Sequence, residues 1–191
     1  EESYFFKMSK YQDRLLQHIK DHPDCIKPES RKNEIIRFIE RGLRDQSVTR
    51  TRASLDWGID VPFDSEHVIY VWFDALINYL TVAGYSIDDE KFNFYWPEAV
   101  HLIGKDILRF HTIIWFTMLM AADIAPPKMV FSHGWWTMEG EKMSKSKGNV
   151  VDPYQITEEF DADAFRYFLL RELCFGQDGN FSKKLRIQRS N

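Results

Sequence analysis

A short segment rich in lysine and serine is the part of the sequence best suited to chemistry. Residues 140–149 read GEKMSKSKGN and carry three lysines and two short hydroxyl side chains: Lys142, Lys145, Lys147, Ser144 and Ser146. A lysine ammonium is a compact cation on a flexible stem, so it can reach a polyphosphate without fixed geometry. Hydroxyl and backbone N–H groups add neutral donors, and the flanking glycines let a loop close over a ligand. The segment predicts a loop that stabilises charge developing on a phosphate, with a solvated turn as the alternative.

Strand-like segments alternate with helical ones before this loop. The strand-like segments are β-branched or aromatic and cover residues 67–72, 99–103 and 128–132. The helical segments between them cover 74–82 and 106–122. This order predicts an α/β fold in which crossover helices join the strands of a parallel sheet. Ligands bind beyond the carboxyl ends of such strands, which here are residues 72–74, 104–106 and 133–134.

The flanking regions are predicted to be mainly helical. An apolar stripe at helical spacing predicts a first helix that ends at Pro23, through Tyr4, Met8, Tyr11, Leu15 and Ile19. A second helix is predicted from Ser30 to Gly42, and residues 47–63, which lack periodicity, are interpreted as a connection. After the loop, Pro153 suits the first turn of a short helix. A last helix is predicted over 161–173, with inward side chains at Phe165, Phe168 and Leu169.

The composition excludes several classes of protein. In 191 residues, 44% are hydrophobic and 28% are charged, which is enough apolar material for a packed core. The 25 Lys and Arg against 29 Asp and Glu argue against a general nucleic-acid coat. Two cysteines, Cys25 and Cys174, cannot form a disulfide framework or a four-cysteine zinc site, and they favour a reducing compartment. The longest apolar run, residues 113–122, has about half the ~20 residues that a membrane span needs.

The loop resembles the lysine signature of class I aminoacyl-tRNA synthetases. Residues 142–146, KMSKS, match that signature residue for residue, between a predicted strand and a predicted helix. Other segments resemble methionyl-tRNA synthetases in particular, namely 56–59 (DWGI), 70–79 (YVWFDALINY), 104–111 (GKDILRFH) and 131–137 (FSHGWWT). A near copy, KMSK at 7–10, falls on the apolar stripe of the first predicted helix and is interpreted as a coincidence.

The resemblance covers residues 1–182 and implies a domain organisation. Residues 66–150 would form the second half of a Rossmann-type, parallel-sheet nucleotide-binding domain that carries the lysine loop. The helical end of a connective insertion would precede it at 1–65, and stem-contact helices would follow at 151–191.

The same resemblance implies a pocket for the methionine side chain. Its residues would be Trp72, Ala75, Tyr79, Ile107 and His111. Ile107 and His111 are four residues apart and share one helix face, with Trp115 a turn further on. A thioether is soft and favourable against aromatic rings, so an aromatic wall with one or two polar tips suits it. Each aromatic or histidine could also be an ordinary core residue.

The resemblance further implies an ATP site. Asp106, with Gly104, would hold the ribose, because a carboxylate can accept from both ribose hydroxyls. His133 and Gly134 would lie beside the nucleotide, where glycine permits close backbone approach. The ATP-binding set is Gly104, Asp106, His133, Gly134, Lys142, Met143, Ser144, Lys145 and Ser146.

The implied reaction has two steps, adenylate formation from methionine and ATP, then transfer of the methionyl group to tRNA(Met). Lys142 and Lys145 would be the catalytic residues, with Lys145 the more important of the two. Mg2+ is expected with ATP, and no zinc site is expected in this chain. The expected partners are methionine, ATP, tRNA(Met) and the remainder of the synthetase, with no membrane. The cytoplasm is the expected location, and the mitochondrial matrix is the alternative.

Two features indicate that the chain is a central piece of such an enzyme. It begins with Glu1 instead of methionine, and it lacks the His-x-Gly-His signature of the class. We therefore expect the chain to be inactive alone. Leucyl, isoleucyl, valyl and cysteinyl enzymes share the lysine signature and stay as alternatives, as does a non-catalytic paralogue that binds tRNA or a partner.

Overall fold

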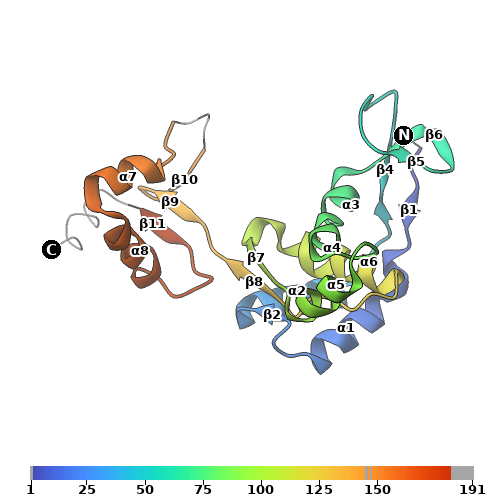
Figure 1. Cartoon of the computed structure of the whole chain (residues 1–191), viewed down its shortest axis with the longest axis horizontal. Helices are drawn as coiled ribbons and strands as arrows, with labels where there is room; N and C mark the ends of the chain where they lie inside the picture. Colours follow the sequence, from blue (N-terminus) through green and yellow to red (C-terminus); the bar gives the residue numbers. More distant parts are fainter. Residues whose placement is uncertain (1, 145, 147, 182–191) are drawn as a thin grey trace. The chain divides into compact units, whose positions relative to one another are not determined.

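The computed structural model describes residues 2–144, 146 and 148–181, which form two compact units (Figure 1). The first unit contains the residues up to Leu102 together with Asp106–Phe131. The second contains Ile103–Lys105 together with the residues from Ser132 onward. The elements are mixed helices and strands, so the α/β class predicted from the sequence is confirmed.

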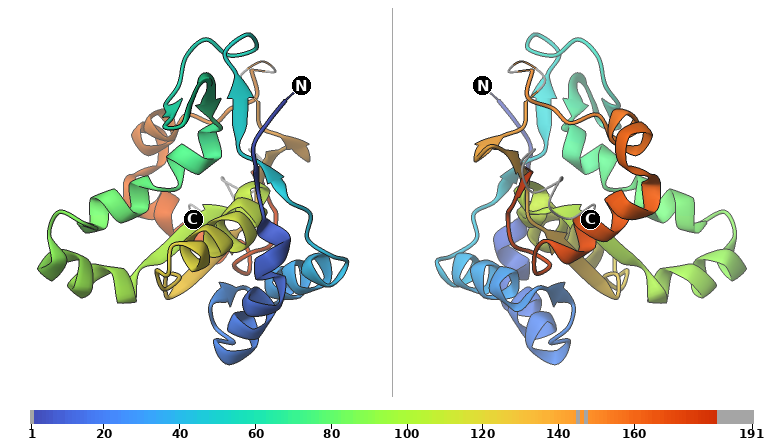
Figure 2. Two further views of the ribbon diagram at one scale, coloured as in Figure 1. Left: turned by 90° about the vertical axis from the view of Figure 1, so that its right-hand side faces the viewer. Right: turned by 90° about the vertical axis from the view of Figure 1, so that its left-hand side faces the viewer.

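Two amphipathic helices open the first unit and lie side by side (Figure 2). They are α1 (Gln12–Asp21), which follows a 3-10 turn, and α2 (Glu29–Glu40). Both predicted helices are confirmed, and their inward side chains, Leu15 and Ile19 in α1 and Ile35 and Ile39 in α2, are buried. The first predicted stripe extends too far toward the N-terminus. Tyr4 precedes a short strand, β1 (Phe5–Phe6), which pairs with β3 (Gln46–Ser47).

A three-stranded antiparallel sheet forms where the sequence predicts a connection. Its strands, in the order β4-β6-β5, are β4 (Thr49–Thr51), β6 (Asp64–Ile69) and β5 (Asp60–Val61). The prediction that residues 67–72 form a strand of the parallel sheet is therefore wrong. Strand β6 ends at Ile69, and α3 (Val71–Ala75) begins directly afterwards, so Trp72 lies on a helix.

Short helices lead from α3 to the parallel sheet. They are α4 (Asn78–Ala83), α5 (Asp89–Tyr95) and a 3-10 turn at Trp96–Glu98. Gly84, with φ +100°, ends α4 in the left-handed conformation that favours glycine. The Asp88 carboxylate accepts from the N–H of Lys91 and caps α5.

A second sheet has the order β2-β8-β7. Its strands are β2 (Ile26–Lys27), β8 (Met129–His133) and β7 (Val100–Gly104). The two strands predicted near 99–103 and 128–132 are confirmed to within one residue. Strand β2, which the sequence did not reveal, pairs parallel with β8 through Ile26 and Val130, both fully buried.

The segment between β7 and β8 is helical, as predicted, but it is not one regular α-helix. A 3-10 turn covers Lys105–Ile107, a π-helical turn covers Phe110–Ile114 and α6 covers Trp115–Ala121. In the π turn the N–H of Trp115 donates to the carbonyl of Phe110, five residues back. Such turns often occur at functional sites, and this one contains His111.

The second unit contains a small sheet packed against two helices. The sheet has the order β10-β9-β11, with β9 (Trp136–Met138), β10 (Glu141–Lys142) and β11 (Gly179–Phe181). The helices, α7 (Pro153–Phe160) and α8 (Ala162–Arg171), confirm both predictions for this region. Ile156, Phe168 and Phe181 form the buried cluster between them. No helix among the described residues is both long and apolar enough to span a membrane.

Candidate active site

Four of the five predicted pocket residues lie together in the first unit. The Tyr79 hydroxyl is 2.9 Å from Nε2 of His111, and Nδ1 of His111 is 3.0 Å from the carbonyl oxygen of Ile107. The Trp72 ring meets the His111 ring edge-on, with centroids 6.1 Å apart. Ala75 ends the helix that carries Trp72, and its carbonyl accepts from the Asn78 amide. The sequence predicted this grouping, and its binding role stays a prediction.

These hydrogen bonds fix the protons of the His111 ring. The Ile107 carbonyl can only accept, so Nδ1 of His111 carries a proton and donates. The side chain is 1% exposed, and this burial lowers the pKa of His111, which keeps the ring neutral. Its Nε2 is therefore an acceptor, and the Tyr79 hydroxyl donates to it. Burial also raises the pKa of Tyr79. The wall formed by Trp72, Tyr79 and His111 therefore carries no charge at neutral pH.

The π turn supports this arrangement. Within it, side chains donate to carbonyls four residues earlier, from His111 to Ile107 and from the Thr112 hydroxyl to Leu108 at 2.8 Å. Phe110, the first residue of the turn, stacks on Trp72 with centroids 4.1 Å apart and planes 18° apart. The turn therefore positions both His111 and Trp72.

Next to Tyr79 lies His101, which the sequence did not indicate as a site residue. The Tyr79 ring stacks on His101, with centroids 4.1 Å apart, and the Trp115 indole donates to Nε2 of His101 at 3.2 Å. Burial, with a smaller effect of His111, lowers the pKa of His101 to about 4. The alternating burial of β7, in which His101 faces inward between exposed Val100 and Leu102, is the strand periodicity that could have indicated it.

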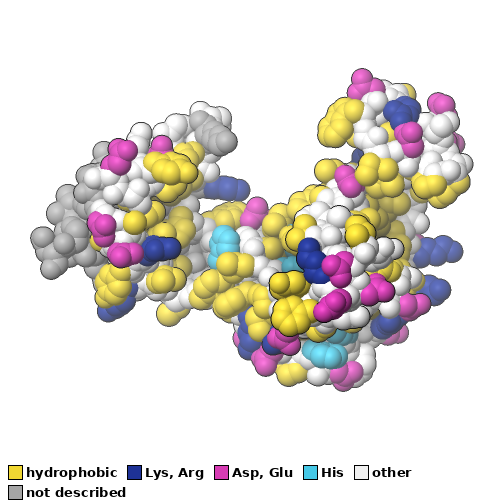
Figure 3. Space-filling view, in the orientation of Figure 1, with side chains coloured by type: hydrophobic (Ala, Val, Ile, Leu, Met, Phe, Trp, Pro, Cys, Tyr) yellow, Lys and Arg dark blue, Asp and Glu magenta, His cyan; other side chains and the backbone are white. Residues whose placement is uncertain are grey.

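Tyr79 and His101 also line a hollow of about 830 Å3 in the first unit. Most of its surface is apolar and comes from α4, α5 and β7. Figure 3 shows hydrophobic side chains on the surface of this unit, and two that line the hollow, Val82 and Phe94, are largely exposed. Tyr79 therefore separates the His111 wall from an open apolar surface.

One cation that the sequence did not indicate contacts Tyr70, the residue that precedes α3. The Arg50 guanidinium lies 4.4 Å from the ring centroid of Tyr70, two residues before Trp72. Its Nη1 donates to the Ser47 hydroxyl at 3.0 Å and to the Thr49 carbonyl at 2.7 Å. Pairing of Arg50 and Val68 between β4 and β6, far apart in sequence, produces this position.

In the second unit, the lysine loop follows a hairpin. Strands β9 and β10 are joined through Glu139 and Gly140, whose φ angles of +49° and +85° are those of a tight two-residue turn.

The Asn149 side chain holds the lysine loop, because its Oδ1 accepts from the N–H of Ser144 at 2.8 Å and its Nδ2 donates to the Lys142 carbonyl at 3.2 Å. Ser144 and Ser146 hydroxyls lie 2.8 Å apart. Lys145 and Lys147 lie outside the described residues.

The Met143 side chain anchors this loop. It is partly buried and packs against the cluster of Ile156, Phe168 and Phe181. An ATP contact from Met143 would therefore come from its backbone.

Trp135 links Lys142 to residues at the ends of two strands. The Lys142 ammonium is 4.2 Å from the ring centroid of Trp135, and the Lys105 ammonium is 4.3 Å from it. Lys105 forms an ion pair with Asp178 at 2.6 Å, and Asp178 accepts from the N–H of Trp135 at 2.9 Å. Cation–π contacts of this kind hold an ammonium with modest strength, so Lys142 can leave for a stronger anionic partner.

The remaining predicted ATP residues lie at or just after the ends of β7 and β8. Gly104 ends β7 and belongs to the second unit, whereas Asp106 lies in the 3-10 turn Lys105–Ile107 and belongs to the first unit. His133 ends β8, and its Nδ1 donates to the Gly134 carbonyl at 2.8 Å. A Cβ at Gly134 would lie 2.1 Å from the carbonyl oxygen of Gln177, so the close approach that requires this glycine is made by the protein's own backbone.

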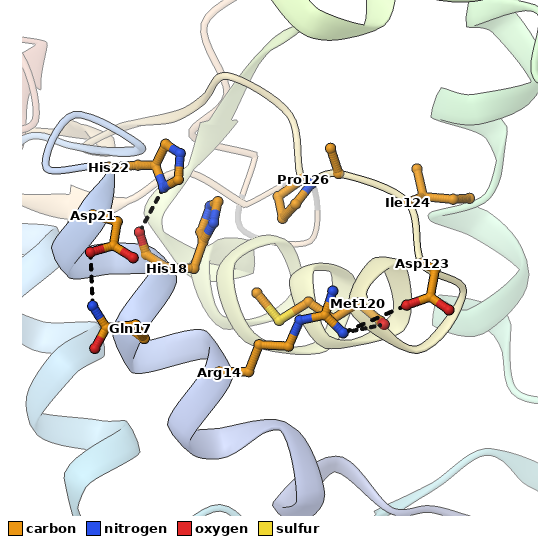
Figure 4. A pocket seen from close by; sticks show the side chains of 10 residues that line it. Arg14, Gln17, His18, Asp21, His22, Met120, Asp123, Ile124 and Pro126 are labelled. Carbon is orange, nitrogen blue, oxygen red and sulfur yellow. Dashed lines mark hydrogen bonds and ion pairs between the residues drawn. The ribbon is translucent and has the colours of Figure 1, made fainter.

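A further hollow of about 490 Å3 lies between α1 and the chain after α6 (Figure 4). Arg14 donates there to the Met120 carbonyl at 3.0 Å and lies 3.7 Å from Asp123. His18 stacks on His22, and burial lowers the pKa of His18 to about 4. This hollow contains none of the predicted site residues.

Among the described residues, no three His, Cys, Asp or Glu side chains are grouped to hold a metal ion.

A parallel strand pair, β2 with β8, that is followed along the chain by a lysine-rich loop is typical of α/β nucleotide-binding proteins. A more specific assignment follows from comparison with known proteins. The family described as tRNA synthetases class I (M) matches residues 1–191, and the chain belongs to this family.

Several relatives are methionine–tRNA ligases. The chain is 59% identical over its whole length to a methionine–tRNA ligase of Caldanaerobacter subterraneus subsp. tengcongensis, and 57% identical to that of Listeria monocytogenes. It spans about 30% of the length of these relatives. It is also similar to the Mycobacterium tuberculosis methionyl-tRNA synthetase in complex with methionyl-adenylate, with a TM-score of 0.92 and 52% identity over 99% of this chain and 37% of that one. The resemblance stated from the sequence is confirmed.

Proposed function

We propose that this chain supplies part of the active site of a methionine–tRNA ligase. The single observation that carries the proposal is the neutral wall in which Tyr79 donates to His111 beside Trp72. The names of the relatives and the methionyl-adenylate of the M. tuberculosis enzyme support it. The corresponding reaction is activation of methionine with ATP, followed by transfer to tRNA(Met).

The wall suits a methionine side chain for physical reasons. A thioether is polarizable and makes favourable contacts with aromatic rings, which Trp72 and Tyr79 provide. The Tyr79 hydroxyl donates a hydrogen bond to His111, and both side chains are neutral. The wall therefore provides no charged partner for a substrate side chain. Charged amino acids would lose their hydration there without compensation.

In the first step, a carboxylate oxygen of methionine forms a bond to the α-phosphorus of ATP. The bond to the bridging oxygen breaks, and pyrophosphate leaves. ATP enters as its Mg2+ complex, which is a substrate. Lys142 and Lys145 stabilise the charge that develops on the phosphates, and Asn149 holds the Lys142 carbonyl in place. Gly104, Asp106, His133 and Gly134 are the proposed contacts of the nucleoside.

In the second step, a hydroxyl of the terminal ribose of tRNA attacks the methionyl carbonyl, and AMP leaves. No side chain of this segment acts as a covalent nucleophile. The domain limits at residues 65 and 150 and the cytoplasmic location, with the mitochondrial matrix as the alternative, also stay predictions.

The test uses the full-length protein that contains this segment and measures methionine-dependent ATP–pyrophosphate exchange. His111→Ala should raise KM for methionine with a smaller change for ATP, because it removes the partner of Tyr79. Lys142→Gln should lower kcat by about a hundredfold, the size expected for loss of one charge-stabilising donor. Folded wild-type protein without exchange would contradict the proposal and favour a non-catalytic paralogue.

A further inference from the structure

His101 differs from an ordinary core histidine in how its ring is held. It lies on β7, is 6% exposed, and accepts the indole N–H of Trp115 at Nε2. An indole N–H can only donate, so Nε2 of His101 must keep a lone pair, and the ring is neutral with its proton on Nδ1. Trp115 itself is 1% exposed, so its N–H has no water to replace His101.

A second tryptophan fixes the surroundings of this pair. The Trp96 indole donates to the Ala125 carbonyl at 2.8 Å, and its ring meets the Trp115 ring at 87° with centroids 6.3 Å apart. The His101 and Trp96 centroids are 6.1 Å apart. The position of His101 is thus determined by one hydrogen bond and by packing from two elements.

The Tyr79 ring packs against the His101 ring. The two rings stack with centroids 4.1 Å apart and planes 27° apart, while the Tyr79 hydroxyl donates to His111. Both rings also line the 830 Å3 hollow, so without the His101 ring one face of Tyr79 would have open space beside it. A tyrosine whose ring can turn no longer presents a fixed hydroxyl to His111.

We infer that His101 is a positioning residue for methionine recognition, in which the Trp115–His101 hydrogen bond and the His101–Tyr79 stack keep the Tyr79 hydroxyl on His111. The inference rests on the proposed function and extends it, since His101 acts through Tyr79 and does not touch the substrate. It assigns methionine selectivity to a chain of four side chains, of which only the last two belong to the predicted pocket.

The experiment is a double-mutant cycle in the full-length protein, with methionine-dependent ATP–pyrophosphate exchange as the assay. His101→Phe keeps a stacking ring and removes the acceptor of Trp115. We expect KM for methionine to rise about tenfold, with KM for ATP changed less than about twofold, because a buried donor is left without a partner beside the pocket. His101→Gln, whose carbonyl can accept from Trp115, should recover part of the loss.

The decisive comparison repeats His101→Phe in a Tyr79→Phe background. If His101 acts through the Tyr79 hydroxyl, the second substitution adds little to KM for methionine, which is the non-additivity expected of coupled residues. A residue that only stabilises the fold gives the same factor in both backgrounds and overturns the inference. His18→Phe, a partly buried histidine on α1, is the matched control and should leave KM unchanged.

The outcomes separate this inference from the proposed function. Folded wild-type protein without exchange overturns the proposed function itself. If the wild-type protein shows exchange but His101→Phe leaves KM for methionine unchanged, only the role of His101 is overturned. The same holds if His101→Phe raises KM for methionine by the same factor in the wild-type and Tyr79→Phe backgrounds. If His101→Phe does not fold, Trp115→Phe removes the same hydrogen bond while both stacked rings stay, and it should raise KM for methionine in the same Tyr79-dependent way.

Discussion

The side chain of Asn149 organises the lysine loop, and its removal should slow adenylate formation. It accepts from the N–H of Ser144 at 2.8 Å and donates to the Lys142 carbonyl at 3.2 Å, so Asn149→Ala removes two hydrogen bonds on either side of Met143. Each such bond contributes about 0.5–1.5 kcal/mol net. A loss of about 1–3 kcal/mol in loop organisation corresponds to a decrease in kcat of about five- to 150-fold.

The assay for Asn149→Ala is ATP–pyrophosphate exchange by the full-length protein, with methionine and ATP varied separately. KM for methionine should stay within about twofold, because the methionine wall lies in the other unit. Asn149→Asp keeps the acceptor for Ser144 and should retain part of the activity, while Asn93→Ala, on an exposed position of α5, is the surface control. A fully active Asn149→Ala protein would refute the reasoning, as would an increase in KM for methionine without loss of kcat.

Three further predictions concern the wall and the packing of the second unit. Tyr79→Phe leaves Nε2 of His111 buried without a donor, so KM for methionine should rise about tenfold in pyrophosphate exchange, and an unchanged KM counts against the wall. Gly134→Ala places a Cβ 2.1 Å from the Gln177 carbonyl, so thermal unfolding should show a loss of about 1–3 kcal/mol or more, and unchanged stability would contradict the close approach. The pKa of His101 is lowered to about 4, so the unfolded chain takes up its proton first, and the stability present above about pH 6.5 should decline as pH falls towards 4. His101→Gln should flatten this part of a pH series of melting temperatures.

Local patterns predicted the parts of the fold that depend on neighbouring residues. Strands β7 and β8 and the helices around Phe168 were located because their apolar periodicity is local. The contact of Tyr79 with His111, 32 residues apart, came from the resemblance and not from spacing. The lysine loop precedes α7, a helix that the sequence predicted from Pro153 onward.

The errors concern structure that forms through distant pairs. The strands between 47 and 63 are two or three residues long and exist because β6 pairs with both β4 and β5, which no short window reveals. The run at 67–72 has strand composition, but the chain changes from β6 to α3 after Ile69. His101 was missed for a similar reason, since its role depends on Trp115 and Tyr79 from other elements.

The central claim is that the wall around Tyr79 and His111 recognises methionine and that the lysine loop serves its activation. The most direct measurement is amino-acid-dependent ATP–pyrophosphate exchange by the full-length protein, compared for methionine, leucine, isoleucine, valine and cysteine. The account predicts exchange with methionine that is at least about a hundredfold more efficient, in kcat/KM, than with any of the other four. Exchange that prefers another of these amino acids, or that is absent in folded protein, would contradict it.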